Sequence, residues 1–415
     1  MQSAIVQLRN AIPDAKIKTF ASVVTLSSLK ERVIEIGYSL GFNRVVIASL
    51  APLDEEALTY QKWLDSGFAA GMEYLKREPA RRSTPALIYP GSLCAIVASV
   101  SYFSEPPPEP DFVFGRVARY AVGLDYHPVI RAKMREYAEL IAKECGRELV
   151  RRPFVDDVAL YEQALAARHG LGFVGKHSLI IGPKLMGTYN FVAELFVDLE
   201  LEADEAYSGT CGSCFRCGIA CPTDAITSGA LVDSNLCISY LTIENKGAIE
   251  RSLRPKLSRW VFGCDICQEV CPYNRKAAPA PWPEFASARG SGHYLDLLEL
   301  LNIDDAGFAA RFATSPLRRP KRRGLLRNAL VVLGNVLGEE GRFSGSIVEA
   351  LSRFISCEED PMLIEHAAWA IACNRQALWS PRVKDSLYAL SKGKYRLEPD
   401  GELALLIDQY ARTTV

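Results

Sequence analysis

Hydrophobic and polar positions alternate along the first half of the chain with two periods, one helical and one extended. Residues 29–40 have apolar positions at helical spacing and are followed by Gly41, whereas residues 44–49 and 93–102 are short buried-strand patterns. The remaining expected elements are helices at 57–66, 128–143 and 159–169 and a strand at 178–182. This mixture predicts an α/β or α+β domain with both sheet faces covered.

The pattern becomes helical from about residue 290. Residues 328–334 are echoed by residues 366–372, close to the roughly 40-residue period of HEAT-type helix pairs, although two copies also fit an ordinary helical bundle. We therefore divide the chain into an N-terminal extension, a mixed helix and strand domain, a cysteine-rich region and a helical tail, at residues 1–27, 28–205, 206–285 and 290–415.

Composition and charge narrow the class of protein. A hydrophobic content of 49% with 23% charged residues is typical of soluble globular domains, and no apolar run approaches the roughly 18 residues of a membrane span. Residues 1–27 lack the strongly apolar centre of an export leader. We expect a cytoplasmic protein without a membrane partner. Because the net charge is only −1, any affinity for nucleic acid must come from local basic patches.

Cysteine spacing carries the strongest chemical signal. Eight of the twelve cysteines lie between Cys211 and Cys271, which favours metal-ligating thiolates over the disulfides of short secreted chains. The first four follow the pattern C-x2-C-x2-C-x3-C-P of bacterial ferredoxins, in which the fourth cysteine ligates a second 4Fe–4S cluster. Zinc sites favour isolated CxxC pairs without this phasing.

A second half-motif completes the ligand count. Cys264, Cys267 and Cys271 repeat the spacing before Pro272, and Cys237 replaces the cysteine that a regular second run would contain. The phasing assigns the first 4Fe–4S cluster to Cys211, Cys214, Cys217 and Cys271, and the second to Cys221, Cys237, Cys264 and Cys267. Two fully ligated clusters transfer electrons, so the roughly 200 preceding residues are expected to hold the reacting pocket.

The motifs around the cysteines, taken in order, resemble the epoxyqueuosine reductase family. They lie at residues 115–120, 125–127, 154–156, 162–168, 172–177, 237–244 and 263–272. The resemblance implies a base-off cobalamin in residues 28–205, reduced through the clusters and used to convert the epoxide of epoxyqueuosine in tRNA to queuosine. It also implies a monomer that receives electrons from a flavodoxin- or ferredoxin-type donor, with residues 290–415 as a HEAT-like tRNA-binding domain.

Asp156 is the catalytic residue that the resemblance implies, as the general acid to the departing epoxide oxygen and as part of the cobalamin site. Asp157 is an alternative, and either aspartate could instead cap the helix that follows. A general acid needs a carboxyl group that is still protonated near neutral pH, which burial can provide. Further candidate cobalamin contacts are Tyr126, His127, Gly175, Lys176 and His177, without a role for His177 as an axial ligand.

A run of cations without an acid lies between residues 316 and 327. Its members are Arg318, Arg319, Lys321, Arg322, Arg323 and Arg327. Charge runs are usually solvated faces, but in combination with the resemblance this run predicts a tRNA phosphate contact. Two other functions fit the cofactor set: a reductive dehalogenase-like corrinoid iron–sulfur enzyme, and a ferredoxin-type electron-transfer protein that binds no corrinoid.

Overall fold

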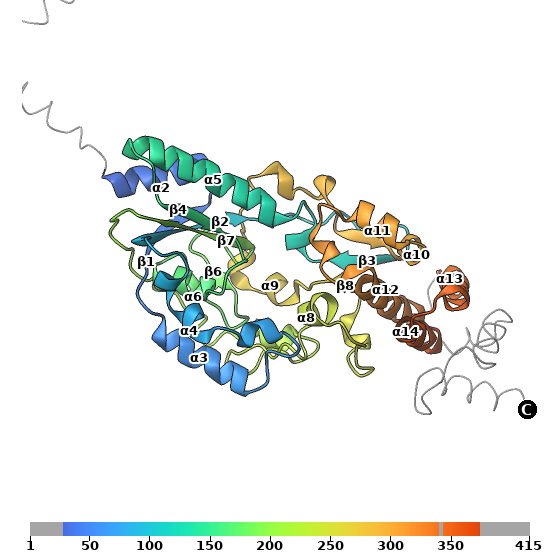
Figure 1. Ribbon diagram of the computed structural model, residues 1–415. Coiled ribbons are helices and arrows are strands. Elements are labelled where there is room, and N and C mark those ends of the chain that lie inside the picture. The colour runs from blue at the N-terminus through green and yellow to red at the C-terminus, as the bar shows by residue number, and fades with distance from the viewer. Residues whose placement is uncertain (1–27, 340–342, 374–415) are drawn as a thin grey trace, which may run out of the picture.

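The computed structural model describes residues 28–339 and 343–373 (Figure 1). The predicted N-terminal extension and the end of the predicted helical tail, from residue 374, lie outside the described residues. Among the residues that are described, none of the helices combines the length and the apolar character that crossing a membrane requires.

A four-stranded sheet with the order β1-β2-β7-β4 forms the centre of the N-terminal part, and all its neighbouring strands are antiparallel. Its strands are β1 (Arg44–Ser49), β2 (Cys94–Ser101), β7 (Asn190–Val197) and β4 (Arg151–Phe154). The predicted strands β1 and β2 are confirmed. β2 is buried along its whole length because both faces of the sheet are covered.

Helices pack on both faces of this sheet (Figure 1). One side carries α2 (Leu29–Ser39) and α5 (Tyr126–Cys145), and the other carries α3 (Asp54–Asp65), α4 (Pro79–Ser83) and α6 (Glu162–Arg168). The antiparallel strand order makes this part α+β rather than α/β. The helix predicted at 159–169 begins only at Glu162, because the preceding residues form a loop.

A second sheet joins segments that are far apart in the sequence. β3 (Phe114–Val117) pairs in parallel with β8 (Trp260–Phe262) and antiparallel with β9 (Tyr294–Asp296). Each strand comes from a different one of the three domains predicted from the sequence, and a single apolar core continues through all of them. The three predicted domains therefore share one core and pack as one body. A small hairpin of β5 (Phe173–Val174) and β6 (Ile180–Ile181) completes the strands.

Short helices carry the cysteines and longer helices follow them. The short ones are α7 (Arg216–Ala220), α8 (Ile238–Ile243) and α9 (Ile266–Glu269). The later ones are α10 (Leu297–Leu301), α11 (Asp305–Arg311), α12 (Lys321–Gly338), α13 (Ser344–Cys357) and α14 (Pro361–Ala372).

The two segments of the sequence repeat lie on α12 and α14, which pack against each other. A Cβ at Gly334 would lie 2.5 Å from the ring of Trp369, so glycine permits this close approach. Most of α12 beyond its first turn is buried, and the helix forms the centre of the C-terminal core.

Candidate active site

Within each predicted ligand set, several thiols lie close enough for their charges to interact. The first group is Cys211, Cys214, Cys217 and Cys271, and the second is Cys221, Cys237, Cys264 and Cys267. In the first group, burial is the main cause of the raised pKa of Cys217 and of Cys271, and the neighbouring Cys211 and Cys214 thiolates raise it further. Cys271 and Cys211 also share one small apolar cluster with Phe173. None of the twelve cysteines, all of which are described, forms a disulfide.

The second group is more deeply buried. Burial raises the pKa of Cys237, Cys264 and Cys267, and each of the three thiols is also affected by charges within its own group, including that of Cys221 on Cys237 and on Cys267. The charge of Cys217 also raises the pKa of Cys267, so the two groups are neighbours. The assignment of these cysteines to two ligand sets therefore stays a prediction from the motif spacing.

Lys176 supports the loop of the first group. Its Nζ donates hydrogen bonds to the carbonyl oxygens of Gly212 at 2.9 Å and Cys214 at 3.1 Å. At Gly175 a Cβ would lie 2.8 Å from the His177 ring. His177 is buried, and burial lowers its pKa to about 4, so the imidazole is neutral. Lys176, Gly175 and His177 therefore lie near the first group and do not line the cleft described next.

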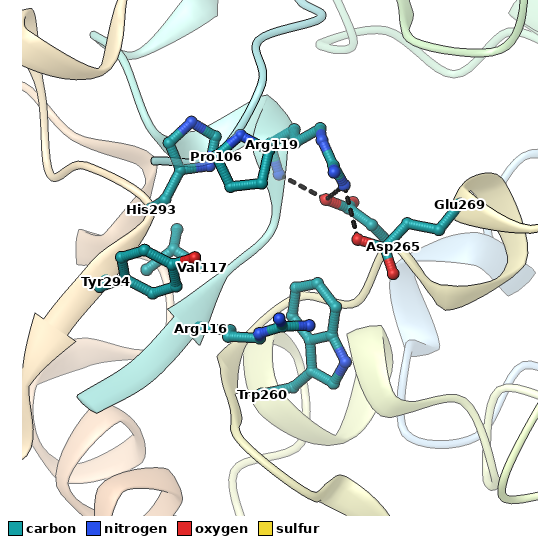
Figure 2. Close-up of a pocket in the computed structure, with 9 residues that line it drawn as sticks. All are labelled: Pro106, Arg116, Val117, Arg119, Trp260, Asp265, Glu269, His293 and Tyr294. Carbon is teal, nitrogen blue, oxygen red and sulfur yellow. Dashed lines mark hydrogen bonds and ion pairs between the residues drawn. The ribbon is translucent and has the colours of Figure 1, made fainter. Parts of the chain in front are cut away.

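An ion-pair network fixes the second group against the N-terminal part (Figure 2). The Arg119 guanidinium contacts Asp265 at 3.1 Å and Glu269 at 2.8 Å, and the backbone N–H of Arg119 donates to Asp265 at 2.8 Å. Asp265 lies between Cys264 and Cys267 in the sequence, and its side chain is 2% exposed. A buried carboxylate is stable only when it is paired, so Arg119 holds this loop in place.

An open cleft with about 1500 Å³ of empty space, including the solvent at its mouth, is lined by residues between Met72 and Arg319 that come from all three domains predicted from the sequence. Four tyrosines line it, Tyr74, Tyr120, Tyr126 and Tyr240. The polar and charged lining includes Asp156, Tyr126, His127, Cys237, Arg318 and Arg319. With Asp125, Glu244 and Arg131, the lining comprises three acids, three arginines and a cysteine of the second group.

Asp156 is held at the edge of this cleft by aromatic neighbours. Its backbone has a left-handed φ of 52°, and its side chain is 66% exposed. The Tyr126 hydroxyl donates to Oδ2 of Asp156 at 2.7 Å, and Nε2 of His127 lies 4.0 Å from the same oxygen. The Tyr126 ring stacks between His127 and Phe191, with centroid distances of 4.0 and 4.4 Å. Burial raises the pKa of Tyr126, and the Asp156 charge raises it further, so Tyr126 is a neutral donor.

Asp125 connects this pair to the basic lining. Its Oδ1 accepts hydrogen bonds from Nδ1 of His127 at 2.7 Å and from the His127 backbone N–H at 3.1 Å, which caps α5. Arg318 lies 3.5 Å from its other oxygen. Burial by itself would raise the pKa of Asp125, but the His127 hydrogen bonds and the Arg318 charge lower it below the usual value.

Asp157 has a different environment. Its carboxylate accepts from the Val155 backbone N–H at 3.0 Å and contacts Arg131 at 2.6 Å, and it does not line the cleft. The alternative that Asp156 or Asp157 caps the next helix is wrong, because the residue before α6 is Tyr161 and no side chain caps that helix.

Two carboxyl groups beside Asp156, one fully buried and one half-buried, were not predicted from the sequence. Glu194 on β7 is fully buried, and neither of its carboxyl oxygens has a hydrogen-bond partner in the described part of the chain. Burial raises its pKa to about 8, with further contributions from Asp156 and Asp157. Glu162 accepts from the Asp156 backbone N–H at 3.2 Å, and burial followed by the Glu194 charge raises its pKa strongly. The available signal was one acid within the apolar strand pattern of residues 190–197.

The six cations of the predicted tRNA patch lie in different environments. Arg318 and Arg319 line the cleft, Lys321 and Arg323 are exposed, and Arg322 is half-buried. Arg327 is fully buried and donates to the carbonyl oxygens of Leu241, Asn245 and Gly247 at 2.6 to 2.7 Å. Its inclusion in a surface patch is therefore wrong, because α12 enters the core after its first turn.

Comparison with known proteins identifies the family. A model for a 4Fe–4S double cluster binding domain matches residues 210–274, and one described as Epoxyqueuosine reductase QueG, DUF1730, matches residues 82–157. The epoxyqueuosine reductase of Vibrio cholerae is 36% identical over 361 residues, covering 85% of this chain and 94% of that protein. This chain belongs to the epoxyqueuosine reductase family. It is an oxidoreductase with an iron–sulfur cluster domain, as predicted, and the two alternative functions are not retained.

Solved structures of the family agree with this assignment. An epoxyqueuosine reductase with a tRNA-Tyr epoxyqueuosine-modified stem loop matches with a TM-score of 0.80 and 26% identity, covering 92% of this chain and 98% of that one. The Bacillus subtilis enzyme, solved with its catalytic aspartate loop swung out of the active site, matches with a TM-score of 0.79 and 26% identity over the same shares.

Proposed function

We propose that this chain reduces the epoxide of epoxyqueuosine in tRNA to give queuosine, with cobalamin bound in the cleft and electrons supplied through two 4Fe–4S clusters. The reaction takes up two electrons and two protons, releases the epoxide oxygen as water and leaves a carbon–carbon double bond. The supporting observation is that Asp156, Cys237 and Arg318 face the same cleft. These side chains can respectively supply a proton, ligate a neighbouring cluster and contact a phosphate.

The lining of the cleft fits a corrin. Its tyrosine rings offer flat apolar surface, and Ser234 and Ser239 add small polar groups suited to the amide edge of the ring. His127, whose orientation Asp125 fixes, adds a polar side chain to this lining. When bound, cobalamin would supply a low-potential cobalt centre as the reductant.

Asp156 is the proposed general acid. Its open position lets the carboxyl group reach a substrate, and the covering of the cleft by cofactor and RNA would remove it from water. Tyr126 and His127 are positioning residues that orient this carboxyl group. The Bacillus subtilis enzyme has a catalytic loop that is named by an aspartate and belongs to its active site, which supports the assignment.

The proposed path of electrons runs from the first cysteine group to the second, since Cys237 of the second group lines the cleft. Arg318 and Arg319, with Lys321 and Arg323 on the adjoining surface, would hold the phosphates of the tRNA. The protein would act as a cytoplasmic monomer that receives electrons from a flavodoxin- or ferredoxin-type donor.

The test is anaerobic turnover of an epoxyqueuosine-containing anticodon stem loop by the reconstituted full chain, with dithionite as the electron source. We expect the nucleoside to lose the mass of one oxygen only when both iron and cobalamin are present, and the protein to bind cobalt and iron together. Conversion without cobalamin, or no conversion by a fully loaded protein, would contradict the proposal.

A further inference from the structure

The reducing electrons must enter the protein at a point away from the substrate. Cys237 of the second group lines the cleft, where bound cofactor and RNA would cover it. Cys271 of the first group instead lines a separate open depression, which has about 710 Å³ of empty space including solvent and shares no lining residue with the cleft. Because the first group reaches a surface that the substrate would not cover, a cluster bound there is the natural point of entry for single electrons.

The surface of this depression has an apolar centre. Ile219 on α7 is 82% exposed, which makes it the most exposed of the large apolar side chains in the described residues. Val270 and Pro272, on either side of Cys271 in the sequence, contribute further apolar surface. Single exposed apolar residues are common, but this one lies beside a predicted cluster ligand with apolar neighbours.

Unpaired positive charge flanks the apolar centre. The exposed guanidinium groups of Arg216 and Arg275 have neither an ion pair nor a side-chain hydrogen bond among residues 28–339 and 343–373. By contrast, Arg318 and Arg319 in the cleft each contact an acid. The acid that lines the depression, Glu269, contacts Arg119 at 2.8 Å and shares this cation with Asp265. The lining of the depression thus carries two arginines against one acid, although the whole chain carries a net charge of −1.

We propose that this depression, formed around Ile219 by Arg216, Arg275, Val270, Cys271 and Pro272, is the docking surface for a small acidic one-electron carrier protein. The inference rests on the proposed function, because it requires a cluster on the first cysteine group. Each encounter oxidises a flavin or iron–sulfur carrier by one electron and reduces the first cluster by one. Two encounters supply the two electrons that one epoxide consumes.

Such a complex is expected to be transient. Redox partners form small interfaces, and complementary charge mainly accelerates their encounter rather than tightening the final complex. Carrier oxidation should therefore be fast at low ionic strength and should slow as salt screens Arg216 and Arg275.

The experiment follows reduction of the clusters in the reconstituted full chain by stopped-flow absorbance, with reduced flavodoxin and reduced 2Fe–2S ferredoxin as separate probes. The double variant Arg216→Glu/Arg275→Glu should lower the second-order rate constant about tenfold or more at low salt and weaken its salt dependence. Ile219→Asp should slow reduction as well. Arg135→Glu makes half of that charge change, on an exposed residue of α5 that lines neither the depression nor the cleft, and it should retain the wild-type rate.

Iron content and the visible spectrum of each variant establish that the clusters are intact. The proposal is overturned if neither carrier reduces the clusters, if the double variant reacts as fast as wild type, or if Arg135→Glu slows the reaction equally. Dithionite-driven turnover of the wild-type protein separates a failure of the proposed function from a failure of the docking surface. If turnover fails while carrier reduction still depends on Arg216 and Arg275, the proposed function is wrong and the docking surface stands.

Discussion

The Tyr126 hydroxyl and the Asp156 carboxylate form a 2.7 Å hydrogen bond at the edge of the cleft. The ring of Tyr126 is fixed by stacking on both faces, so this bond defines where the otherwise exposed carboxylate points. By contrast, Asp157 is turned toward Arg131. Two adjacent aspartates therefore have separate tasks, one facing the cleft and one tying the loop to α5.

Replacing each aspartate by asparagine separates these tasks. Asp156→Asn should lower the single-turnover rate on the stem loop by about 100-fold or more, because the proposed proton donor is lost. Asp157→Asn should mainly lower the melting temperature, since it weakens the contact with Arg131. The measurement is nucleoside conversion at equal iron and cobalamin load. A larger rate loss for Asp157→Asn than for Asp156→Asn would reverse the assignment.

Tyr126→Phe tests the positioning role. The variant keeps the stacked ring and removes only the hydroxyl, so Asp156 loses its oriented partner. Hydrogen bonds to charged groups are worth about 1.5 to 3 kcal/mol, and we expect kcat to fall about tenfold. KM for the stem loop should change little. If KM rises while kcat stays at the wild-type value, Tyr126 contacts the substrate and does not orient the acid.

Glu194 should make stability depend on pH. Its pKa is about 8 in the folded chain against an ordinary value of 4.5, so the folded state holds a proton that the unfolded state has released over this interval. The free energy of unfolding should therefore fall as pH rises from about 4.5 to about 8. The groups that act on Glu194 are Glu162 on α6 and the loop residues Asp156 and Asp157.

Glu194→Gln removes the ionisable group and keeps its shape. We expect the variant to melt at a higher temperature than wild type at pH 8.5 and to lose part of the pH dependence, with Glu162 responsible for the remainder. Melting temperatures between pH 5 and pH 8.5, at equal cluster content, provide the measurement. Glu136→Gln on the exposed face of α5 is the matched control. Parallel pH curves for wild type and Glu194→Gln would show that the buried carboxyl is not protonated.

Local patterns in the sequence predicted what depends on neighbouring residues. The period of apolar positions located β1 and β2, and the cysteine spacing located the iron–sulfur domain, because the closely spaced ligand run is local in the sequence. The predicted domain boundaries agree less well with the packing of the segments in the structure. The sheet of β3, β8 and β9 pairs strands whose sequences are separated by more than a hundred residues, and no local period encodes such pairing.

The same limit explains the residues that were misplaced or missed. Whether Asp156 or Asp157 faces the cleft depends on Arg131 and Tyr126, which lie on a helix earlier in the chain. Glu194 and Glu162 become neighbours only when α6 packs on the sheet. The cation run suggested one surface, but the same helix that exposes Arg323 carries Arg327 into the core.

Arg327 is expected to be a structural residue. Its guanidinium donates to three backbone carbonyl oxygens, one on α8 and two in the loop that follows it, and burial lowers its pKa to about 10. Arg327→Met should therefore destabilise the fold by about 3 kcal/mol or more, since buried acceptors lose their donors. Chemical denaturation gives the free energy of unfolding. If the Arg327→Met protein is stable but binds tRNA poorly, Arg327 contacts RNA and is not a structural residue.

The cations at the cleft should instead govern RNA affinity. Arg318 and Arg319 are more than half exposed, and although each contacts an acid, those contacts are largely solvent-screened and can be exchanged for phosphates. Arg318→Ala/Arg319→Ala should weaken stem-loop binding and reduce the slope of log Kd against log salt by about two, one for each lost phosphate contact. Arg135→Ala removes one positive charge outside the cleft and should leave both quantities as in wild type. An unchanged salt slope in the double variant would mean that the tRNA backbone lies elsewhere on the protein.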